Sequence, residues 1–171
     1  MSGEDGGLIE VVPRDPELGF VGDIIDVNTG MLERLLAENL IPVISSIGSD
    51  RKGQAYNINA DTAAGAIAGA LGAEKVVFLT DVAGLLTDID DPTSIVATAT
   101  LAQLEPLIAD GTIAGGMVPK VDSCIQAVRA GARAAHMLDG RIPHVLLLEL
   151  FTDAGIGTKI TASSETTGDT V

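Results

Sequence analysis

Two short apolar runs open the chain and predict a β-hairpin over residues 7–22. The runs cover residues 8–12 and 18–21, and the segment PRDP between them has the composition of a turn. Asn28 can then cap a helix. The apolar positions of that helix recur at helical spacing, at Leu32, Leu35, Leu36 and Leu40.

Residues 41–47, IPVISSI, form a compact apolar run with β-branched side chains and predict a buried strand. A polar loop over 48–55 separates this run from a second helix, which we expect to begin at Asn59 and to end at Gly72. Alanine and glycine dominate that helix, so it can pack closely on a neighbouring element. Another buried strand is expected over residues 76–79.

The second half of the chain continues the alternation of extended and helical patterns. A polar loop over 88–94 precedes a helix expected over 100–110, and a glycine pair at 115–116 precedes a further helix. The apolar positions of this last helix that we expect to face inward are Val118, Val121, Ile125 and Val128. Two apolar segments, 134–138 and 145–148, fit either a helix or a strand.

Strands that alternate with helices predict an α/β fold, layered αβα around a largely parallel central sheet. Ligands of such sheets bind at the carboxyl ends of the strands. We expect a single domain over residues 1–160, followed by a disordered polar tail over 161–171.

Composition narrows the possible functions. The 171 residues are 46% hydrophobic and 20% charged, with a net charge of −14, which suits a chain with a sizeable core. The sequence has no cluster of Lys and Arg for a phosphate backbone and few aromatic rings for stacking, which excludes nucleic acid as a partner. No apolar run is long enough to cross a membrane. A single cysteine, Cys124, and a polar acidic start favour the cytoplasm and exclude a signal peptide.

Several common catalytic motifs are missing. Gly48 and Gly53 have the spacing of a P-loop, but Gln54 stands where that motif requires lysine. The dinucleotide-binding fingerprint and the serine-hydrolase elbow are absent as well. His136 and His144 have no metal-binding partners at the usual spacing, so no metal held by protein side chains is expected.

Three segments have residues suited to chemistry, and each also has a purely structural explanation. In the first, Asn59 can cap the second helix and Asp61 lies in its first turn, where the helix dipole favours a carboxylate. In the functional alternative, Asn57 binds an amino-acid ligand, because its side-chain amide both donates and accepts hydrogen bonds. Asp61 could then hold a catalytic lysine in place.

The second segment, LTDVAGLL at 79–86, follows a strand at the sheet edge where nucleotides often bind. Its structural alternative is an Asx-type turn with Gly84 at a special backbone angle. The third segment, GGMVPK at 115–120, begins a helix whose free N–H groups suit an anion. The helix dipole opposes the charge of Lys120, which favours a phosphate or carboxylate partner over a solvated surface lysine.

In their order along the chain, these segments resemble the acetylglutamate kinases of the amino-acid kinase family. The resemblance runs from residue 2 to residue 160. The matching stretches are SGEDGGLI, LGFVGDIIDVN, NINADTAAGAIAGALGAEKVVFLTDVAGLL, GGMVPKVDSCIQAV and HVLLLELFTDAGIGTKI. Five motifs in family order are far more specific than any one of them.

The resemblance implies phosphorylation of the γ-carboxylate of N-acetylglutamate by ATP in arginine biosynthesis, with Mg²⁺ held mainly by ATP oxygens. It implies that Lys120 stabilises the transferring phosphoryl group, that Asp61 orients the catalytic lysines, and that Asn57 and Asn59 bind acetylglutamate. The residues implied to hold the nucleotide are Thr80, Asp81, Gly84, Leu85, Leu86, Gly115, Gly116 and Met117.

Residues 144–159 are similar to the signature of arginine-inhibited members, which are typically hexamers. The resemblance assigns the binding of an arginine effector to His144, Glu149, Gly155 and Gly157. The Glu149 carboxylate would accept two hydrogen bonds from the guanidinium group of arginine. The structural alternative treats His144 and Glu149 as surface residues.

The chain departs from the family pattern at its start. Family members begin with a lysine-bearing strand, a glycine-rich turn, and a later glycine pair and arginine that bind acetylglutamate, and none of these is present. We therefore expect the nucleotide-binding half of an incomplete enzyme, with hexamer assembly in the complete family enzyme. The alternatives are a non-catalytic module that binds nucleotide or arginine, and another amino-acid kinase such as carbamate kinase or glutamate 5-kinase.

Overall fold

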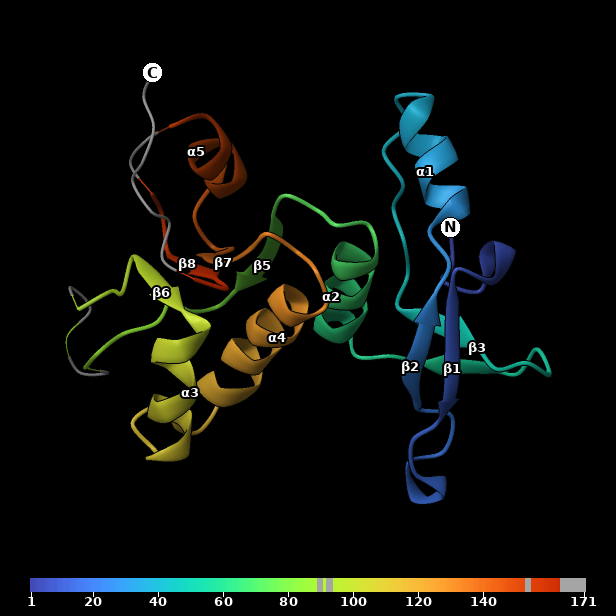
Figure 1. Ribbon diagram of the computed structural model, residues 1–171, viewed down its shortest axis with the longest axis horizontal. Helices are drawn as coiled ribbons and strands as arrows, with labels where there is room; N and C mark the ends of the chain where they lie inside the picture. The colour runs from blue at the N-terminus through green and yellow to red at the C-terminus, as the bar shows by residue number, and fades with distance from the viewer. Residues whose placement is uncertain (89–90, 92–93, 153–154, 164–171) are drawn as a thin grey trace.

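The computed structural model describes residues 1–88, 91, 94–152 and 155–163, and it confirms the α/β class. Two four-stranded sheets lie on opposite sides of the molecule, with helix α2 (Ala60–Ala70) between them (Figure 1). Both sheets contain parallel and antiparallel pairs. The single, largely parallel sheet expected from the sequence is therefore wrong in this detail, because hairpins and an antiparallel return strand contribute half of the pairings.

The first sheet is built from two hairpins and has the strand order β2-β1-β3-β4. Its strands are β1 (Ile9–Pro13), β2 (Gly22–Val27), β3 (Ile47–Ser49) and β4 (Ala55–Asn57). Strand β1 pairs with β2 in antiparallel fashion and with β3 in parallel fashion, which joins the two hairpins into one sheet. The polar loop expected over 48–55 is thus the tip of the β3–β4 hairpin.

The predicted first hairpin forms, but its second strand begins later than expected. Residues Pro16–Leu18 make a short 3-10 helix, in which the Asp15 carboxylate accepts a hydrogen bond from the backbone N–H of Glu17 at 2.9 Å. Leu18 and Phe20 are exposed at 55% and 66%. A strand over 18–21 is therefore wrong, because the aspartate and proline of the turn sequence favour a local turn instead.

Helix α1 (Gly30–Ala37) follows Asn28 as predicted, and it buries Leu32 against the first sheet. Asn39 adopts a left-handed backbone angle, φ +56°, that ends the helix before Leu40. The buried strand expected over 41–47 is wrong for most of its length. Only Ile47 belongs to β3, and Ile41 and Val43 are exposed at 89% and 77%.

Helix α2 begins and ends where the sequence predicts. The Asn59 side-chain oxygen accepts a hydrogen bond from the Thr62 N–H at 3.0 Å, and Gly72 follows the helix with a φ of +58°. A Cβ atom added at Gly69 would lie 2.5 Å from the Cβ of Ala130. Glycine at this position therefore allows α2 to approach helix α4 (Met117–Arg129) closely.

The second sheet has the order β5-β7-β8-β6. Its strands are β5 (Val76–Thr80), β6 (Thr98–Thr100), β7 (Ala134–Asp139) and β8 (Thr158–Thr161). Helices α3 (Leu101–Ala109) and α5 (Val145–Phe151) complete this half. Of the two ambiguous apolar segments, 134–138 is therefore a strand and 145–148 is helical.

Parts of two predicted irregular segments lie outside the described residues. Within the polar loop expected over 88–94, residues 89, 90, 92 and 93 are not described. Thr161 still belongs to β8, so a tail that begins at 161 is wrong at its first residue, and residues 164–171 are outside the description.

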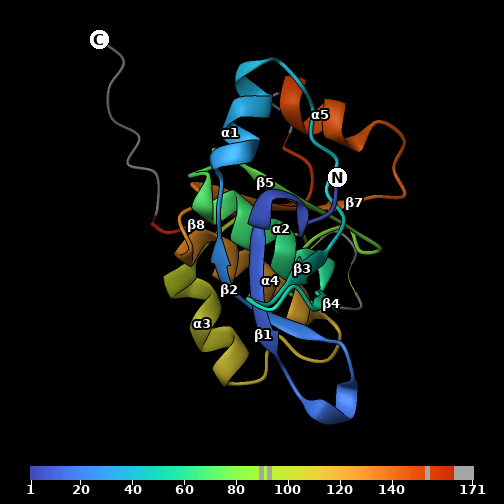
Figure 2. The ribbon, with the colours of Figure 1, turned by 90° about the vertical axis from the view of Figure 1, so that its right-hand side faces the viewer.

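Two hydrophobic cores meet at α2. The larger core lies between the second sheet and helices α3 and α4, and it includes Val121, Ile125 and Val128, which were expected to face inward. The smaller core lies between the first sheet and α2, and Figure 2 shows α2 behind that sheet. Helix α2 contributes Ala68 to the larger core and Ala63 to the smaller one. None of the helices in the described part of the chain has the length and apolar character needed to cross a membrane.

Replacing Gly69 with alanine should destabilise the protein by about 1–3 kcal/mol, because the added methyl group overlaps Ala130. Urea unfolding measures this change. The control is Ala70→Ser on the exposed side of the same helix, which should stay within about 0.5 kcal/mol of the parent. Equal stability of Gly69→Ala and the parent would contradict close α2–α4 packing.

Candidate functional site

The carboxyl ends of β5 and β7 lie side by side and form the edge on which the candidate site is built. Thr80 and Asp139 are register partners at the ends of these parallel strands. The backbone N–H of Gly140 donates to the Thr80 carbonyl at 2.8 Å. Asp81 directly follows β5, and Arg141 follows β7 after Gly140, so both charged groups emerge at this edge.

Lys120 reaches this edge from the first turn of α4 and forms an ion pair with Asp81. The Asp81 side chain is 78% exposed, whereas that of Lys120 is 27% exposed. The hydrogen bond from Lys120 is the chief reason that the pKa of Asp81 lies below its ordinary value, and the charge of Arg141 makes a small contribution. Two of the three predicted segments therefore meet at this pair.

Arg141 supplies a second cation beside Lys120. Its Nε donates to Asp139 Oδ1 and its Nη2 to Asp139 Oδ2, both at 2.8 Å. This two-point contact with the guanidinium lowers the pKa of Asp139 to about 2. The sequence analysis missed Arg141, because its place beside Asp81 depends on the pairing of β5 with β7.

Leu85, Leu86 and Met117, three residues of the predicted nucleotide set, line one cleft of 400 Å³. Ile113 and Thr112, from the connection between α3 and α4, line its remaining wall. The next residues, Gly115 and Gly116, have no neighbouring heavy atom where a Cβ would stand. Its lining combines apolar side chains with the polar Thr87, Asp88 and Thr112, and the cleft opens beside backbone that carries no side chains.

Thr158 anchors the turn after β5 to β8. The backbone of Gly84 has a φ of +153°, and a Cβ there would lie 2.8 Å from the Thr158 hydroxyl. That hydroxyl, which is fully buried, accepts a hydrogen bond from the Leu85 N–H at 2.8 Å. The special backbone angle predicted for Gly84 is confirmed. The Thr80 hydroxyl is also used within the fold, since it donates to the Val82 carbonyl at 3.0 Å.

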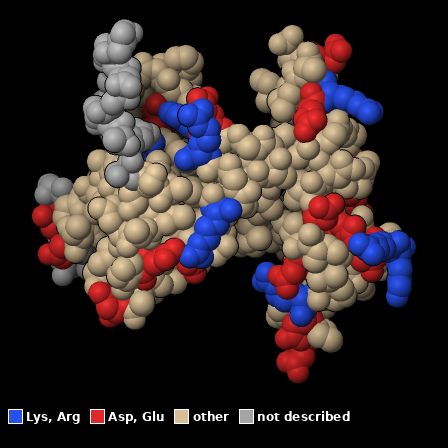
Figure 3. All heavy atoms as spheres, viewed as in Figure 1, with Lys and Arg blue, Asp and Glu red and all other residues tan. Residues whose placement is uncertain are grey.

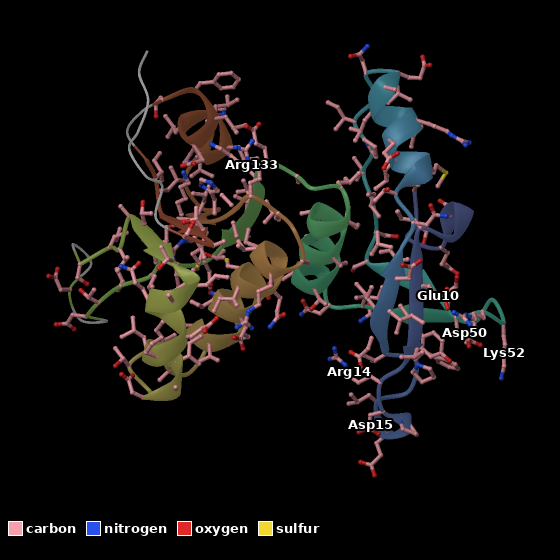
Figure 4. The ribbon with its side chains drawn as sticks, in the orientation of Figure 1. Glu10, Arg14, Asp15, Asp50, Lys52 and Arg133 are labelled. Carbon is pink, nitrogen blue, oxygen red and sulfur yellow. The ribbon has the colours of Figure 1, made fainter. Side chains whose placement is uncertain are left out.

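Asn59 and Asp61 line a second, larger cleft of 670 Å³ between α2 and α4. Pro119 and Ser123 form its α4 wall, and Arg14 of the first hairpin lines it too. Arg14 extends from the hairpin toward the side of the molecule that holds the two helices (Figure 4). Amide, carboxylate and guanidinium groups therefore converge on this space.

The structure does not bring Asp61 into contact with Lys120. Lys120 is not among the residues that line the larger cleft, although its neighbour Pro119 is. Within the described ranges, the Asp61 carboxylate has no ion pair or hydrogen bond. Burial raises the pKa of the Cys124 thiol on α4 to about 12, and the negative charge of Asp61 adds to this rise.

The two predicted substrate asparagines also have structural roles. The Asn59 side-chain oxygen caps α2. Asn57 lies in β4 opposite Ile47, and its backbone N–H donates to the Phe20 carbonyl at 2.8 Å. Asn57 is not among the residues lining the larger cleft. Arg14, which does line it, had been assigned only to a turn, because nothing in its local sequence indicates that it faces α2.

Glu149 lies on α5 and its side chain is buried against β7, so its interpretation as a surface residue is wrong. Its side chain is 8% exposed, and its Oε1 lies 2.7 Å from His136 Nδ1 and 3.6 Å from Lys75 Nζ. Its Oε2 accepts a hydrogen bond from the Ile156 N–H at 3.3 Å. Burial lowers the pKa of His136, although the neighbouring Glu149 carboxylate acts in the opposite sense.

The other predicted effector residues are divided between this cluster and the surface. Gly157 lies against β7, where a Cβ would be 2.1 Å from the Met137 carbonyl oxygen, whereas the space around Gly155 is open. His144 is exposed and precedes α5 in a left-handed conformation. The histidine that contacts Glu149 is therefore His136, which sequence reasoning had considered only as a metal ligand. The register of β7 places it there.

Charged side chains are intermingled on the visible face of the molecule, where basic groups lie next to acidic ones (Figure 3). In the part of the chain that the structure describes, no three His, Cys, Asp or Glu side chains are grouped so that they could hold a metal ion.

Comparison with known sequences identifies relatives over nearly the whole chain. A model of the amino acid kinase family matches residues 1–139. Acetylglutamate kinase from Nostoc sp. (strain PCC 7120) is 51% identical over 164 residues, which are 95% of this chain and 55% of the relative. Acetylglutamate kinase from Synechococcus sp. (strain ATCC 27144) is 54% identical over 162 residues, 94% of this chain and 54% of the relative. The chain thus spans about half the length of the curated relatives it matches.

Solved structures share the fold. N-acetylglutamate synthase from Neisseria gonorrhoeae, complexed with coenzyme A and L-arginine, aligns with a TM-score of 0.80 and 26% identity, over 95% of this chain and 38% of that one. Carbamate kinase from Giardia lamblia bound to AMP-PNP aligns with a TM-score of 0.68 and 20% identity, over 91% and 59%. This second likeness concerns the fold alone.

Thr158→Val should destabilise the protein by about 1–3 kcal/mol, because it leaves the buried Leu85 N–H without an acceptor. Urea unfolding gives the change. The exposed Thr98→Val on β6 serves as control and should stay within about 0.5 kcal/mol of the parent. If the two variants are equally stable, the turn after β5 is not anchored by Thr158.

Asp139→Asn should remove stability that depends on pH. The pKa of Asp139 falls from its ordinary 3.8 to about 2 on folding, so its contribution is present above pH 4 and disappears as pH falls toward 2. Thermal melting between pH 2 and pH 7 should show the parent and variant converging at the acidic end. Asp26→Asn, an exposed carboxylate on β2, is the control. A parent–variant difference that stays constant with pH would refute this role of Arg141.

Proposed function

Because this chain belongs to the amino acid kinase family, we propose that it takes part in the ATP-dependent phosphorylation of the γ-carboxylate of N-acetyl-L-glutamate. The observation that carries the proposal is the position of Lys120, whose ammonium group lies at the carboxyl end of β5. The cleft lined by Leu85, Leu86 and Met117 begins on the same turns. The similarity to acetylglutamate kinases supports this substrate over others of the family.

In this proposal the 400 Å³ cleft accepts the adenosine part of ATP. Leucine and methionine side chains suit an apolar ring system. The phosphates would then lie along Gly115 and Gly116, where no side chain blocks the backbone and the N-terminus of α4 favours an anion. Thr80, Asp81 and Gly84 shape the turn that forms the floor of this site.

Phosphoryl transfer requires positioning and neutralisation of charge more than covalent chemistry from the protein. Lys120 and Arg141 bring two positive charges to the strand edge. When ATP binds, Lys120 would leave Asp81 and bind the transferring phosphoryl group. Bound Mg²⁺, held mainly by ATP oxygens, would neutralise further phosphate charge.

The 670 Å³ cleft is the proposed place for acetylglutamate. Asn59 and Arg14 offer an amide and a guanidinium, which suit the amide and carboxylate groups of that substrate. The two clefts adjoin the same turn of α4, since Met117 lines one and Pro119 the other. Asp61 lies on the substrate side, where it would orient a lysine on closure of the site.

Arginine is a proposed effector. An N-acetylglutamate synthase of the same fold is complexed with L-arginine, and Glu149 accepts a hydrogen bond from the N–H of Ile156, the residue between Gly155 and Gly157. Because both Glu149 oxygens already have partners, arginine would have to displace Lys75 or Ile156 from this carboxylate. Assembly into a hexamer and a cytoplasmic location are expectations for the full-length enzyme.

Calorimetry should detect binding of Mg-ATP by the chain. In an enzyme of full family length that contains these residues, Lys120→Ala should lower turnover about 10²–10³-fold, because a preorganised charge at the transition state is lost. ATP affinity should change far less. Lys52→Ala, on the exposed tip of the β3–β4 hairpin, should leave both unchanged. Unaltered turnover in Lys120→Ala, or no binding of ATP, would reject the proposal.

A further inference from the structure

Arg141 stands in a tight turn at the carboxyl end of β7. Its backbone N–H donates to Asp139 Oδ1 at 3.0 Å, and the Ile142 N–H donates to the Asp139 carbonyl at 3.2 Å. The turn is also tied to the neighbouring strand β5, because the Gly140 N–H donates to the Thr80 carbonyl at 2.8 Å. The backbone of Arg141 is therefore fixed by two parallel strands that end at the same edge.

The Arg141 side chain is anchored on one side and open on the other. Its Nε and Nη2 atoms donate to the two oxygens of Asp139. The Asp139 side chain is 10% exposed, whereas that of Arg141 is 67% exposed. The remaining N–H groups, on Nη1 and on the outer side of Nη2, have no acceptor among the described residues. They form a second fork, which can bind an anion while Asp139 keeps the first.

The groups around this turn already stabilise negative charge at the strand edge. The Asp81 carboxylate is paired with Lys120, and its side chain is 78% exposed. The hydrogen bond from Lys120 lowers the pKa of Asp81 most, and the charge of Arg141 lowers it further. Cations from the first turn of α4 and from the turn after β7 thus act on one anion. A phosphate that replaces Asp81 beside Lys120 would meet Arg141 as well.

We infer that Arg141 is a second phosphate-binding residue of the nucleotide site, which holds the phosphate chain of both ATP and ADP. The inference rests on the proposed binding of ATP at this edge. Lys120 has to leave Asp81 before it binds a phosphate, whereas Arg141 is already held by Asp139. Because a donor fixed in advance loses little freedom on binding, Arg141 contributes to nucleotide affinity before any transfer takes place.

A purely structural role accounts for less of this geometry. The Asp139 carboxylate already secures the turn through the backbone N–H of residue 141, which every residue type except proline supplies. A guanidinium group is not needed for that contact. Arg133, just before the amino end of β7, offers a comparison (Figure 4). It pairs with Glu74 at 3.5 Å, through one nitrogen, and both side chains are exposed.

The test compares Mg-ATP, Mg-ADP and adenosine in NMR titrations of the chain. Arg141→Gln retains hydrogen-bonding groups but removes the charge. It should raise the Kd for Mg-ATP and for Mg-ADP about tenfold or more, as expected when a hydrogen bond to a charged group is lost. The Kd for adenosine, which has no charge, should stay within about twofold. Added salt should weaken Mg-ATP binding less in the variant than in the parent, because one cation is missing.

Arg133→Gln is the matched control, since it removes an exposed, ion-paired arginine from the opposite end of the same strand. It should leave all three Kd values unchanged. Arg141→Lys retains the charge but lacks the second fork, so it should raise the Kd for Mg-ATP about threefold. Thermal melting verifies that each variant folds, and Arg141→Lys decides the question if Arg141→Gln does not fold.

Three results would overturn the inference. If the folded Arg141 variants bind Mg-ATP as tightly as the parent does, Arg141 does not bind phosphate, and the proposed kinase function still stands. If adenosine binding weakens as much as Mg-ATP binding, the substitution has disturbed the cleft as a whole and the role of Arg141 is structural. If the parent chain binds no Mg-ATP, the proposed function fails together with the inference.

Discussion

Close contact between α2 and α4 determines where the candidate site residues lie. Helix α2 carries Asn59 and Asp61, and α4 carries Met117 and Lys120 in its first turn. The glycines of α2 allow the two helices to approach without intervening side chains. A bulkier residue there would move the first turn of α4 away from the ends of β5 and β7. Helix α2 also contributes to both hydrophobic cores, so packing and site geometry have one origin.

Because of this packing, the candidate site is divided into two clefts, one on each side of the first turn of α4. The 400 Å³ cleft is bounded by the turn after β5, which Thr158 holds in place. The 670 Å³ cleft is bounded by α2, α4 and the first hairpin. Lys120 projects from the shared turn and is paired with Asp81. A bound phosphate would compete with that carboxylate for the ammonium group, which explains how one lysine can be held ready without a substrate.

The sequence predicted local features well wherever local interactions decide the structure. The Asn59 cap, the end of α2 at Gly72 and the angle at Gly84 were all foreseen, because capping and left-handed backbone depend on residue type. The second strand of the hairpin and the strand over 41–47 were misplaced, because burial depends on which neighbours are present. Arg14 and His136 were missed as members of their clusters, since strand register and helix packing bring them to their partners.

The family resemblance contributed what local patterns could not, namely a set of residues of which Leu85, Leu86 and Met117 line one cleft. It did not foresee that Lys120 would contact Asp81 in place of Asp61.

The most direct measurement of the central claim is the NMR spectrum of the chain titrated with Mg-ATP. The account predicts that the amides of Leu85, Leu86 and Gly116 shift and that the Lys120 ammonium signal changes as its pair with Asp81 opens. Shifts confined to the cleft around Arg14, or no shifts at all, would contradict it.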